Sequence, residues 1–348
     1  MPLPSRKPRI GYFVSSHGFG HAARTRTILQ ELQGLADVTV YSTAPDWFWG
    51  DLTVRHERYQ ADIGCIQKET LNIDEYATSC AYRAFHSEKH RRFDEVSQYH
   101  YATPFDGIVS DIAPEPLEFA NLLGIKSLLV ANFTWIEIYE PMPAMSPVIP
   151  EIERQYSQAD VVCIPGLRTG MTWAKTAFLV DPVAELGSCI REKLNPKTRY
   201  TKVIYIDAGR WGADISWQNA ANYVDTLFVR IGTRLDHLPE NVLQLEFGDV
   251  RHTDLVKSVD LVVSKPGYGI VTECLANGTP WGCIPRRGFA EDDVLIQAAT
   301  DANLVTIVDA NQLKSLDFHC MCKVQHSSKL QFDGAKQIAA HVLTSLAS

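Results

Sequence analysis

The run Ile10-Gly-Tyr-Phe-Val14, followed directly by Ser15-Ser-His-Gly-Phe-Gly-His21, decides how the first half of the chain folds. A short, uninterrupted apolar run is typical of a strand that is buried on both faces. Residues 21–35 come next and predict an amphipathic helix, while the glycines before them let the backbone turn sharply and approach a ligand. A buried strand, a glycine-rich loop and a helix in this order indicate a parallel α/β domain.

Working outward from this run, short apolar stretches alternate with helix-length stretches along most of the chain. Further strands are predicted at residues 38–41, 107–110, 127–130, 161–164, 202–206, 226–230, 261–264 and 281–284. Residues 181–200 interrupt the series with prolines and charges, which is typical of a linker. We therefore expect two doubly wound, Rossmann-like domains, residues 1–185 and 200–334, and a final helix at 335–348 that could pack on either one.

Composition and charge exclude several classes of protein. The 348 residues are 45% hydrophobic and carry a net charge of −8, which gives no support to sequence-independent binding of nucleic acid. The apolar run at residues 10–14 is too short for a signal peptide or a membrane span, so we expect a cytoplasmic protein with no transmembrane segment. Eight cysteines lack the spacing of a zinc site; we expect reduced thiols and no metal.

The first glycine-rich loop is a candidate ligand site. Gly18, Gly20 and Ala23 fit the dinucleotide-binding spacing, but no acidic residue ends the second predicted strand to hold a ribose. This absence argues against a nicotinamide or flavin enzyme. His21 at the start of the helix is a candidate general base, or else a histidine that caps or packs. Asp111 follows the strand at 107–110, at the edge where ligands meet a parallel sheet, and could orient it.

A second candidate site lies in the second half, where Ser264-Lys-Pro-Gly-Tyr-Gly269 joins a strand to a helix that ends at Gly278. The free amides at the helix start would bind an anion, with the charge of Lys265 nearby. Glu273 lies one turn inside the helix, where it could accept ribose hydroxyls or remain a surface glutamate. Arg286, Arg287 and the acidic residues 291–293 could border the same pocket or form a solvated loop.

Two other stretches leave alternatives open. Residues 55–101 are polar and aromatic, as expected of a solvated helix pair or of a region that flanks a cleft. Trp47-Phe-Trp49 is a candidate apolar surface patch, with buried aromatic side chains as the alternative.

The candidate loops carry a resemblance to known enzymes. Residues 15–24, Val109-Ser-Asp-Ile-Ala-Pro114, Ala131-Asn-Phe-Thr-Trp135, residues 264–273 and Pro285-Arg-Arg287 resemble the glycosyltransferase-like half of plant arabinokinases. More distantly, they are similar to the peptidoglycan N-acetylglucosaminyltransferase and to the UDP-glycosyltransferases of GT-B fold. The resemblance extends over residues 9–310 in the same order, and it implies a GT-B fold with a cleft between the domains.

The resemblance also implies roles for single residues. His21 matches the catalytic base of the UDP-glycosyltransferases and Asp111 its partner; Gly267 and Gly269 match the donor diphosphate loop, and Glu273 the ribose-binding glutamate. The full expected donor set is Gly209, Lys265, Gly267, Gly269, Glu273, Arg287, Asp292 and Asp293. The expected acceptor side comprises His17, Gly18, Gly20, Asn132 and Trp135.

Some features depart from these families. Asp292 and Asp293 stand where the peptidoglycan enzyme has paired glutamines, so the donor sugar can differ. The tryptophan and glutamine of the plant donor motif are missing, so uridine is inferred from the majority of the family. The kinase half of arabinokinase is absent, and sugar-kinase activity is not implied.

Together these features predict a glycosyltransferase, inverting and independent of metal and cofactors, that uses a nucleotide sugar, with UDP as the expected carrier, and an unidentified acceptor. One alternative is a nucleotide-sugar epimerase or hydrolase on the same fold. Another is a sugar-nucleotide-binding protein without catalysis.

Overall fold

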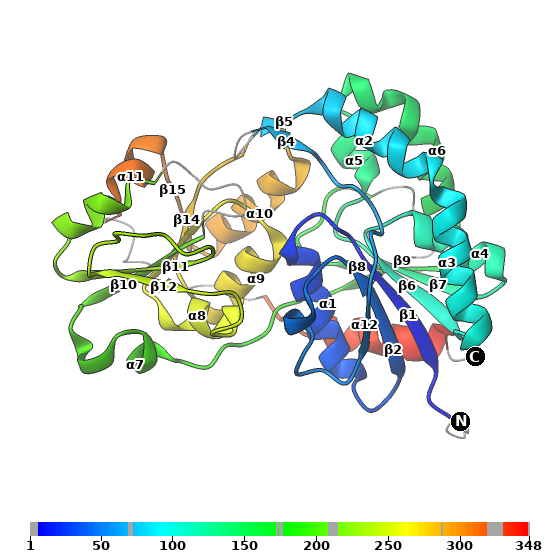
Figure 1. Cartoon of the computed structure of the whole chain (residues 1–348), viewed down its shortest axis with the longest axis horizontal. Coiled ribbons are helices and arrows are strands. Elements are labelled where there is room, and N and C mark those ends of the chain that lie inside the picture. The colour runs from blue at the N-terminus through cyan, green and yellow to red at the C-terminus, as the bar shows by residue number, and fades with distance from the viewer. Residues whose placement is uncertain are drawn as a thin grey trace. The chain divides into compact units, whose positions relative to one another are not determined.

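Residues 6–68, 72–171, 173, 177–207, 215–286, 288–318 and 330–346 are described in this computed structural model. The chain divides into two compact units (Figure 1). The first comprises Met1–Lys68, Ile73–Val183 and Gln331–Ser348, and the second comprises Glu69–Asn72 and Ala184–Leu330. Each unit is built on its own parallel sheet.

The first unit is built on a seven-stranded parallel sheet in the order β3-β2-β1-β6-β7-β8-β9. Its strands are β1 (Arg9–Val14), β2 (Asp37–Ser42), β3 (Arg55–Arg58), β6 (Gly107–Asp111), β7 (Lys126–Val130), β8 (Val161–Pro165) and β9 (Ala177–Val180). Strand β6 is buried throughout and β1 is buried beyond its first residue, as their apolar runs predict. The order of the strands reverses between β1 and β6, which makes the carboxyl ends of these two strands the expected ligand site.

Helices cover both faces of this sheet (Figure 1). They are α1 (Phe19–Leu32), α2 (Glu75–Ser87), α3 (Lys89–Ala102), α4 (Glu115–Leu123), α5 (Trp135–Tyr139), α6 (Ile149–Tyr156) and α12 (Gly334–Leu346), with short 3-10 turns η1 (Asp46–Phe48) and η2 (Pro143–Val148). A separate two-stranded ribbon pairs β4 (Gln67–Lys68) with β5 (Asn72–Ile73). Helix α1 ends at Leu32, earlier than the predicted residue 35, because the backbone turns at Gly34, which has a φ of +77°.

The final helix, α12, belongs to the first unit, where it packs against α1 and the strands β6 to β9. Gly107 makes this contact possible, because a Cβ at this position would lie 2.9 Å from the side chain of Leu346. The backbone of Val183 also pairs with that of Asp333, next to the start of α12. Residues 331–334 therefore lie in the first unit, whereas the sequence had assigned them to the second domain.

The second unit is built on a six-stranded parallel sheet in the order β12-β11-β10-β13-β14-β15. Its strands are β10 (Lys202–Asp207), β11 (Thr226–Ile231), β12 (Val242–Leu245), β13 (Leu261–Ser264), β14 (Trp281–Cys283) and β15 (Val305–Ile307). Its helices are α7 (Arg191–Leu194), α8 (His252–Ser258), α9 (Tyr268–Asn277), α10 (Ala290–Asp301) and α11 (Ala310–Ser315), with η3 (Pro196–Thr198) and η4 (Trp217–Asn222). Its order reverses between β10 and β13, which predicts a second ligand site there.

The expected linker is part of the second unit. Gly187 N donates to Asn277, Ser188 N donates to Asp254 and Ile190 N donates to Ser258. The boundary between the units therefore falls between Val183 and Ala184. The cleft expected between the two domains stays a prediction.

Residues 55–101 and 47–49, for which the sequence allowed two alternatives each, combine features of both. Residues 55–101 do contain a helix pair, α2 and α3, but it is not simply solvated, because Arg92 is buried in an ion pair with Glu115. Trp49 is buried, whereas Trp47 is 46% exposed. The cysteines of the described ranges are free thiols, and Cys320 and Cys322 lie outside those ranges.

Candidate active site

The site expected in the first unit forms where β1 and β6 end side by side. The two strands pair in register up to Val14 and Asp111, and Ser15 N donates to the backbone oxygen of Asp111 at 3.0 Å. The loop that follows turns at Gly18, whose φ of +85° is in the region that favours glycine. Helix α1 then begins and carries His21 over the end of β6.

His21 and Asp111, far apart in sequence, are brought together here. The imidazole Nδ1 of His21 lies 3.2 Å from Oδ1 of Asp111, and the ring packs edge-on against Phe133 at 5.7 Å between centroids. His21 is 7% exposed and Asp111 is fully buried. No hydrogen bond in the described part of the chain occupies Nε2 of His21. This nitrogen can therefore act on a ligand.

Arg24, one turn further along α1, is a member of the site that the sequence analysis missed. Its guanidinium donates from Nε to Oδ2 of Asp111 at 2.8 Å and from Nη2 to Oδ1 at 2.6 Å. Its Nη1 donates to the side-chain oxygen of Asn132 at 2.5 Å. Thr25 adds a long contact from its hydroxyl to Oδ2 of Asp111, at 3.5 Å. Asp111 is thus held from α1 by an arginine and a histidine together.

The charge of Asp111 follows from these contacts. Burial acts to raise the pKa of this carboxyl, because it removes water from the charged form. The positive charge of Arg24 and the hydrogen bonds from His21 and Arg24 outweigh burial, and the pKa of Asp111 is lowered from its ordinary value. Asp111 is therefore a carboxylate at neutral pH, and it can only accept hydrogen bonds.

The backbone directly after Asp111 is strained. Ile112 has a φ of +65°, a region that β-branched residues almost never enter. Its N–H donates to Val130 at 3.1 Å, and its oxygen accepts from the Tyr156 hydroxyl at 2.6 Å. Strain of this kind costs about 1–3 kcal/mol and persists where the surroundings enforce it. Here it turns the chain at the end of β6, directly after the carboxylate.

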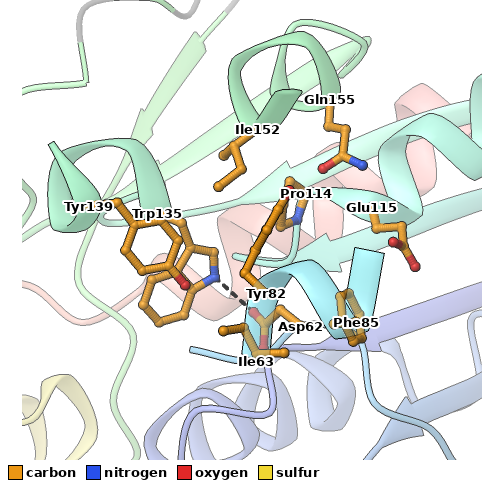
Figure 2. Close-up of a pocket in the computed structure, with 11 residues that line it drawn as sticks. Asp62, Ile63, Tyr82, Phe85, Pro114, Glu115, Trp135, Tyr139, Ile152 and Gln155 are labelled. Atoms are coloured by element: carbon orange, nitrogen blue, oxygen red, sulfur yellow. Dashed lines mark hydrogen bonds between the residues drawn. The ribbon is translucent and has the colours of Figure 1, made fainter. Parts of the chain in front are cut away.

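Asp62 is a second buried carboxyl that the sequence analysis missed. Its Oδ1 accepts from the backbone N–H of Ser16 at 2.8 Å, and its Oδ2 accepts from Nε1 of Trp135 at 2.9 Å (Figure 2). Burial raises the pKa of Asp62, although these hydrogen bonds and the one from Ser15 oppose it. Asp62 therefore ties the glycine-rich loop to α5.

Figure 2 shows that Asp62 also lines a small pocket between residues 61–63, residues 114–115 and the helices α2, α5 and α6. Its free volume of about 10 Å³ is enough for about one water molecule. Trp135 and Tyr139 stack beside it at 5.3 Å. This pocket is too small for a sugar.

The other residues expected on the acceptor side fall into two groups. His17 and Gly18 lie on the accessible loop and Gly20 lies exposed in the first turn of α1, and Nδ1 of His17 accepts from the backbone N–H of Cys65 at 3.3 Å. Asn132 and Trp135 are buried, at 0% and 1% exposed. They hold Arg24 and Asp62 in place and do not face solvent.

In the second unit, the expected anion site is at the start of α9. Gly267 caps this helix without a side-chain hydrogen bond, and Gly269 lies in its first turn. Lys265 lies just before it, and no hydrogen bond or ion pair in the described ranges holds its ammonium group. Burial and the nearby charge of Arg286 lower the pKa of Lys265 from its ordinary value.

Glu273 has a partner that the sequence did not reveal. Nδ1 of His252, the first residue of α8, lies 2.5 Å from Oε2 of Glu273. The Glu273 side chain is 12% exposed and that of His252 is 37% exposed. Burial acts to lower the pKa of His252, but the charge and the hydrogen bond of Glu273 outweigh it and raise the pKa.

Among the remaining expected donor residues, Asp292 lies near enough to Lys265 for the two charges to act on each other. Asp292 is buried in an ion pair with Arg286, whose Nε donates to Oδ2 at 3.0 Å, whereas Asp293 is exposed. Burial raises the pKa of Asp292 against the effect of Arg286. Gly209 and Arg287 lie outside the described residues. Within the described ranges, no three His, Cys, Asp or Glu side chains gather in a way that would hold a metal ion.

A few sequence signals could have found the missed residues. Arg24 follows His21 by three positions, and residues three apart share a helix face, so its inward direction was predictable. Asp62 and His252 had no local signal, because each meets its partner through the tertiary fold.

Comparisons with known proteins bear on the fold of this chain. No protein-family model matches the chain. It is 24% identical over 302 residues to an L-arabinokinase of Arabidopsis thaliana. The matched stretch covers 82% of this chain and 29% of that protein. The chain thus spans about three tenths of the length of the curated relative it matches.

Several solved structures are similar over nearly the whole chain. A UDP-glucosyltransferase of Polygonum tinctorium, capable of glucosylating indoxyl, gives a TM-score of 0.63 at 14% identity and covers 99% of this chain and 94% of its own. UGT89C1 of Arabidopsis thaliana, complexed with UDP-L-rhamnose, gives 0.63 at 14% identity, with 98% and 95% covered. The glycosyltransferase SnogD of Streptomyces nogalater gives 0.58 at 16% identity, with 99% and 96% covered.

All helices in the described ranges are too short or too polar to cross a lipid bilayer. The two parallel-sheet units and the likeness to these structures agree with each other. The chain therefore has the GT-B fold of the glycosyltransferases.

Proposed function

We propose that this protein is a glycosyltransferase that moves a sugar from a nucleotide sugar to an acceptor hydroxyl, with inversion at the anomeric carbon. The observation that carries the proposal is the His21–Asp111 pair, which lies at the switch point of the first sheet. A buried carboxylate on Nδ1 and an unoccupied Nε2 are the arrangement that a general base needs.

In the proposed reaction, Nε2 of His21 takes the proton of the acceptor hydroxyl. The acceptor oxygen forms a bond to the anomeric carbon while the bond from that carbon to the diphosphate breaks. The electron pair leaves with the nucleoside diphosphate, and the imidazolium that forms is stabilised by Asp111. A single displacement of this kind inverts the anomeric centre. Asp111 does not itself need to take up the proton.

The second unit would bind the donor. Amides at the start of α9 and the ammonium of Lys265 would stabilise the leaving diphosphate without a metal ion. Glu273 would accept the ribose hydroxyls. UDP is our proposed carrier, supported by the UDP-L-rhamnose bound to the similar UGT89C1.

The acceptor would approach the accessible part of the glycine-rich loop, at His17 and Gly18, and the first turn of α1, at Gly20. Asn132 and Trp135 are too buried to contact it and would act by holding other residues of the site.

The test is to incubate the protein with a panel of UDP-sugars, with and without candidate acceptors, and to measure UDP release and the fate of the sugar. Acceptor-dependent UDP release that is lost in His21→Ala is the expected result. Interconversion or hydrolysis of the donor by the protein alone would support an epimerase or hydrolase instead. Donor binding without turnover across the panel would support a binding protein.

A further inference from the structure

A base histidine works only if its proton is on the correct nitrogen. A neutral imidazole carries one proton, on Nδ1 or on Nε2, and only the unprotonated nitrogen can accept another. For His21 to act through Nε2, the proton must lie on Nδ1. The group that faces Nδ1 therefore decides whether the proposed base can function.

Two groups among the described residues face this nitrogen. Oδ1 of Asp111 lies 3.2 Å from Nδ1, and Nη2 of Arg24 lies 3.4 Å from it. Arginine can only donate, so a hydrogen bond from Arg24 would place the imidazole proton on Nε2. However, the contact of Nδ1 with Arg24 is the longer of the two, and a hydrogen bond from Nδ1 to the carboxylate of Asp111 is assisted by the charge of its acceptor. Nδ1 is thus left to donate to Asp111.

Asp111 can accept from Nδ1 only while it is ionised. Its side chain is fully buried, and a buried carboxyl without a partner becomes protonated. A protonated Asp111 could donate its own proton to Nδ1 and leave the imidazole proton on Nε2. The guanidinium prevents this, because it stays positively charged and holds both carboxylate oxygens.

The guanidinium is itself fixed. Its third nitrogen donates to Asn132, at the end of β7, and its side chain is 1% exposed. The arginine therefore has one orientation, and it presents one carboxylate geometry to His21. Asp62, on a neighbouring segment, also interacts electrostatically with His21 and is held by Ser16 and Trp135.

From this geometry we infer that Arg24 is the positioning residue that keeps Asp111 an acceptor and so fixes the imidazole proton of His21 on Nδ1. The role of Arg24 in catalysis rests on the proposed glycosyl transfer. The position of the proton on His21 is independent of that proposal, because it is a property of the protein without substrate.

Nitrogen NMR of the histidine rings measures this position directly at neutral pH. Wild-type protein should show His21 protonated on Nδ1, with the assignment made by loss of the signal in His21→Ala. Arg24→Gln, which removes the charge, should move the proton to Nε2. Arg24→Lys, which keeps the charge, should restore Nδ1–H. Arg26→Gln is the matched control: it changes an arginine of the same helix that holds Phe48 and Asp51, and it should leave His21 unchanged.

A second readout applies once an acceptor is known. Arg24→Gln should lower kcat by about 10²- to 10⁴-fold, the loss expected when the base holds its proton on the wrong nitrogen, with donor affinity unchanged. A tautomer shift in a protein that transfers no sugar would support the inference and contradict the proposed function. An unchanged tautomer in Arg24→Gln together with a His21-dependent transfer of sugar would contradict the inference and support the proposed function.

Two results overturn the inference: a proton on Nε2 in the wild type, or Nδ1–H retained in Arg24→Gln. Should Arg24→Gln not fold, the wild type and Arg24→Lys decide. Nδ1–H in both supports the inference, and Nε2–H in either one overturns it.

Discussion

Two acidic residues, one in each unit, have opposite surroundings. Asp111 ends β6 in the first unit, is fully buried and is held by the permanent charge of Arg24. Glu273 lies on α9 in the second unit, is 12% exposed at its side chain and is held by His252. The first partner never loses its charge, whereas the second can.

This difference suits the two carboxylates to different roles. A carboxylate with a permanent partner and no access to water has one position and one charge, which suits the orientation of a neighbouring base. A carboxylate with a titratable partner and an open edge can exchange that partner for ligand hydroxyls at small cost. We propose from this contrast that the first unit carries the chemistry and the second unit binds the donor, and the following predictions test this in order of decreasing effect.

The largest effect is expected on turnover. His21→Ala should lower turnover by about 10²- to 10⁴-fold, the usual contribution of a positioned general base, and leave the affinity for UDP unchanged. Steady-state kinetics and calorimetry with UDP measure the two effects separately. His90→Ala, which changes an exposed histidine of α3, is the control. Near-normal turnover in His21→Ala, or a parallel loss of UDP affinity, would contradict the proposal that the first unit carries the chemistry and the second unit binds the donor.

The next effect concerns stability. Asp111→Asn leaves Arg24 buried without its charge partner, and we expect a loss of about 3–5 kcal/mol in the free energy of unfolding. Because the pKa of Asp111 is lowered in the folded protein, this stabilisation is present above its ordinary pKa and is lost as the pH falls through the lowered one. Urea unfolding at neutral and acidic pH measures both.

The double variant Arg24→Gln, Asp111→Asn should recover part of that loss, since no charge then remains unpaired in this pair. If it is as unstable as the sum of the two single variants, Arg24 and Asp111 do not act as one unit. Glu273→Gln should cost much less stability, because its surroundings are partly open to water.

The sequence predicted the sheets better than the contacts within the site. Apolar runs identified β1, β6, β10 and β13, because a strand buried on both faces leaves a continuous signal in the chain. Because these strands were identified, the segments that follow them could be located, and His21, Asp111 and Glu273 were predicted to lie in those segments. The fold class and the order of these loops were therefore predictable and are confirmed.

The partners of these residues were not predictable. His252 reaches Glu273, and Asp62 reaches Ser16 and Trp135, only through tertiary packing. The expected end of the first domain at residue 185 lies two residues from the observed boundary, but most of the expected linker, residues 181–200, belongs to the second unit, because it hydrogen-bonds to α8 and α9. Arg24 was within reach of a helix-face argument. The roles of the site residues themselves stay predictions.

A moderate effect is expected on the binding side of the comparison. Glu273→Ala should weaken UDP binding by about 1–3 kcal/mol, the cost of losing hydrogen bonds to a charged acceptor, with the melting profile nearly unchanged. Titration calorimetry without divalent ions measures the affinity and also tests independence of metal. Glu240→Ala is the control, since Glu240 pairs with Arg199 on the surface of the same unit. Equal UDP affinity in both variants would exclude Glu273 from the donor site.

The smallest effect should come from the pH dependence of the His252–Glu273 pair. The pKa of His252 is raised by Glu273, so the folded protein binds the imidazolium proton more tightly than the unfolded chain does. The stabilisation is therefore fully present below the ordinary pKa of 6.5 and is lost as the pH rises through the raised value. Because more than a third of the His252 side chain is exposed, water screens the pair, and we expect at most about 1 kcal/mol. Melting temperatures of His252→Gln and the wild type should therefore differ most at acidic pH and converge as the pH rises, while His90→Gln should show no such trend. A difference that grows with pH would mean that His252 stabilises the second unit as a neutral side chain, and the contrast between a permanent and a titratable partner would then fail.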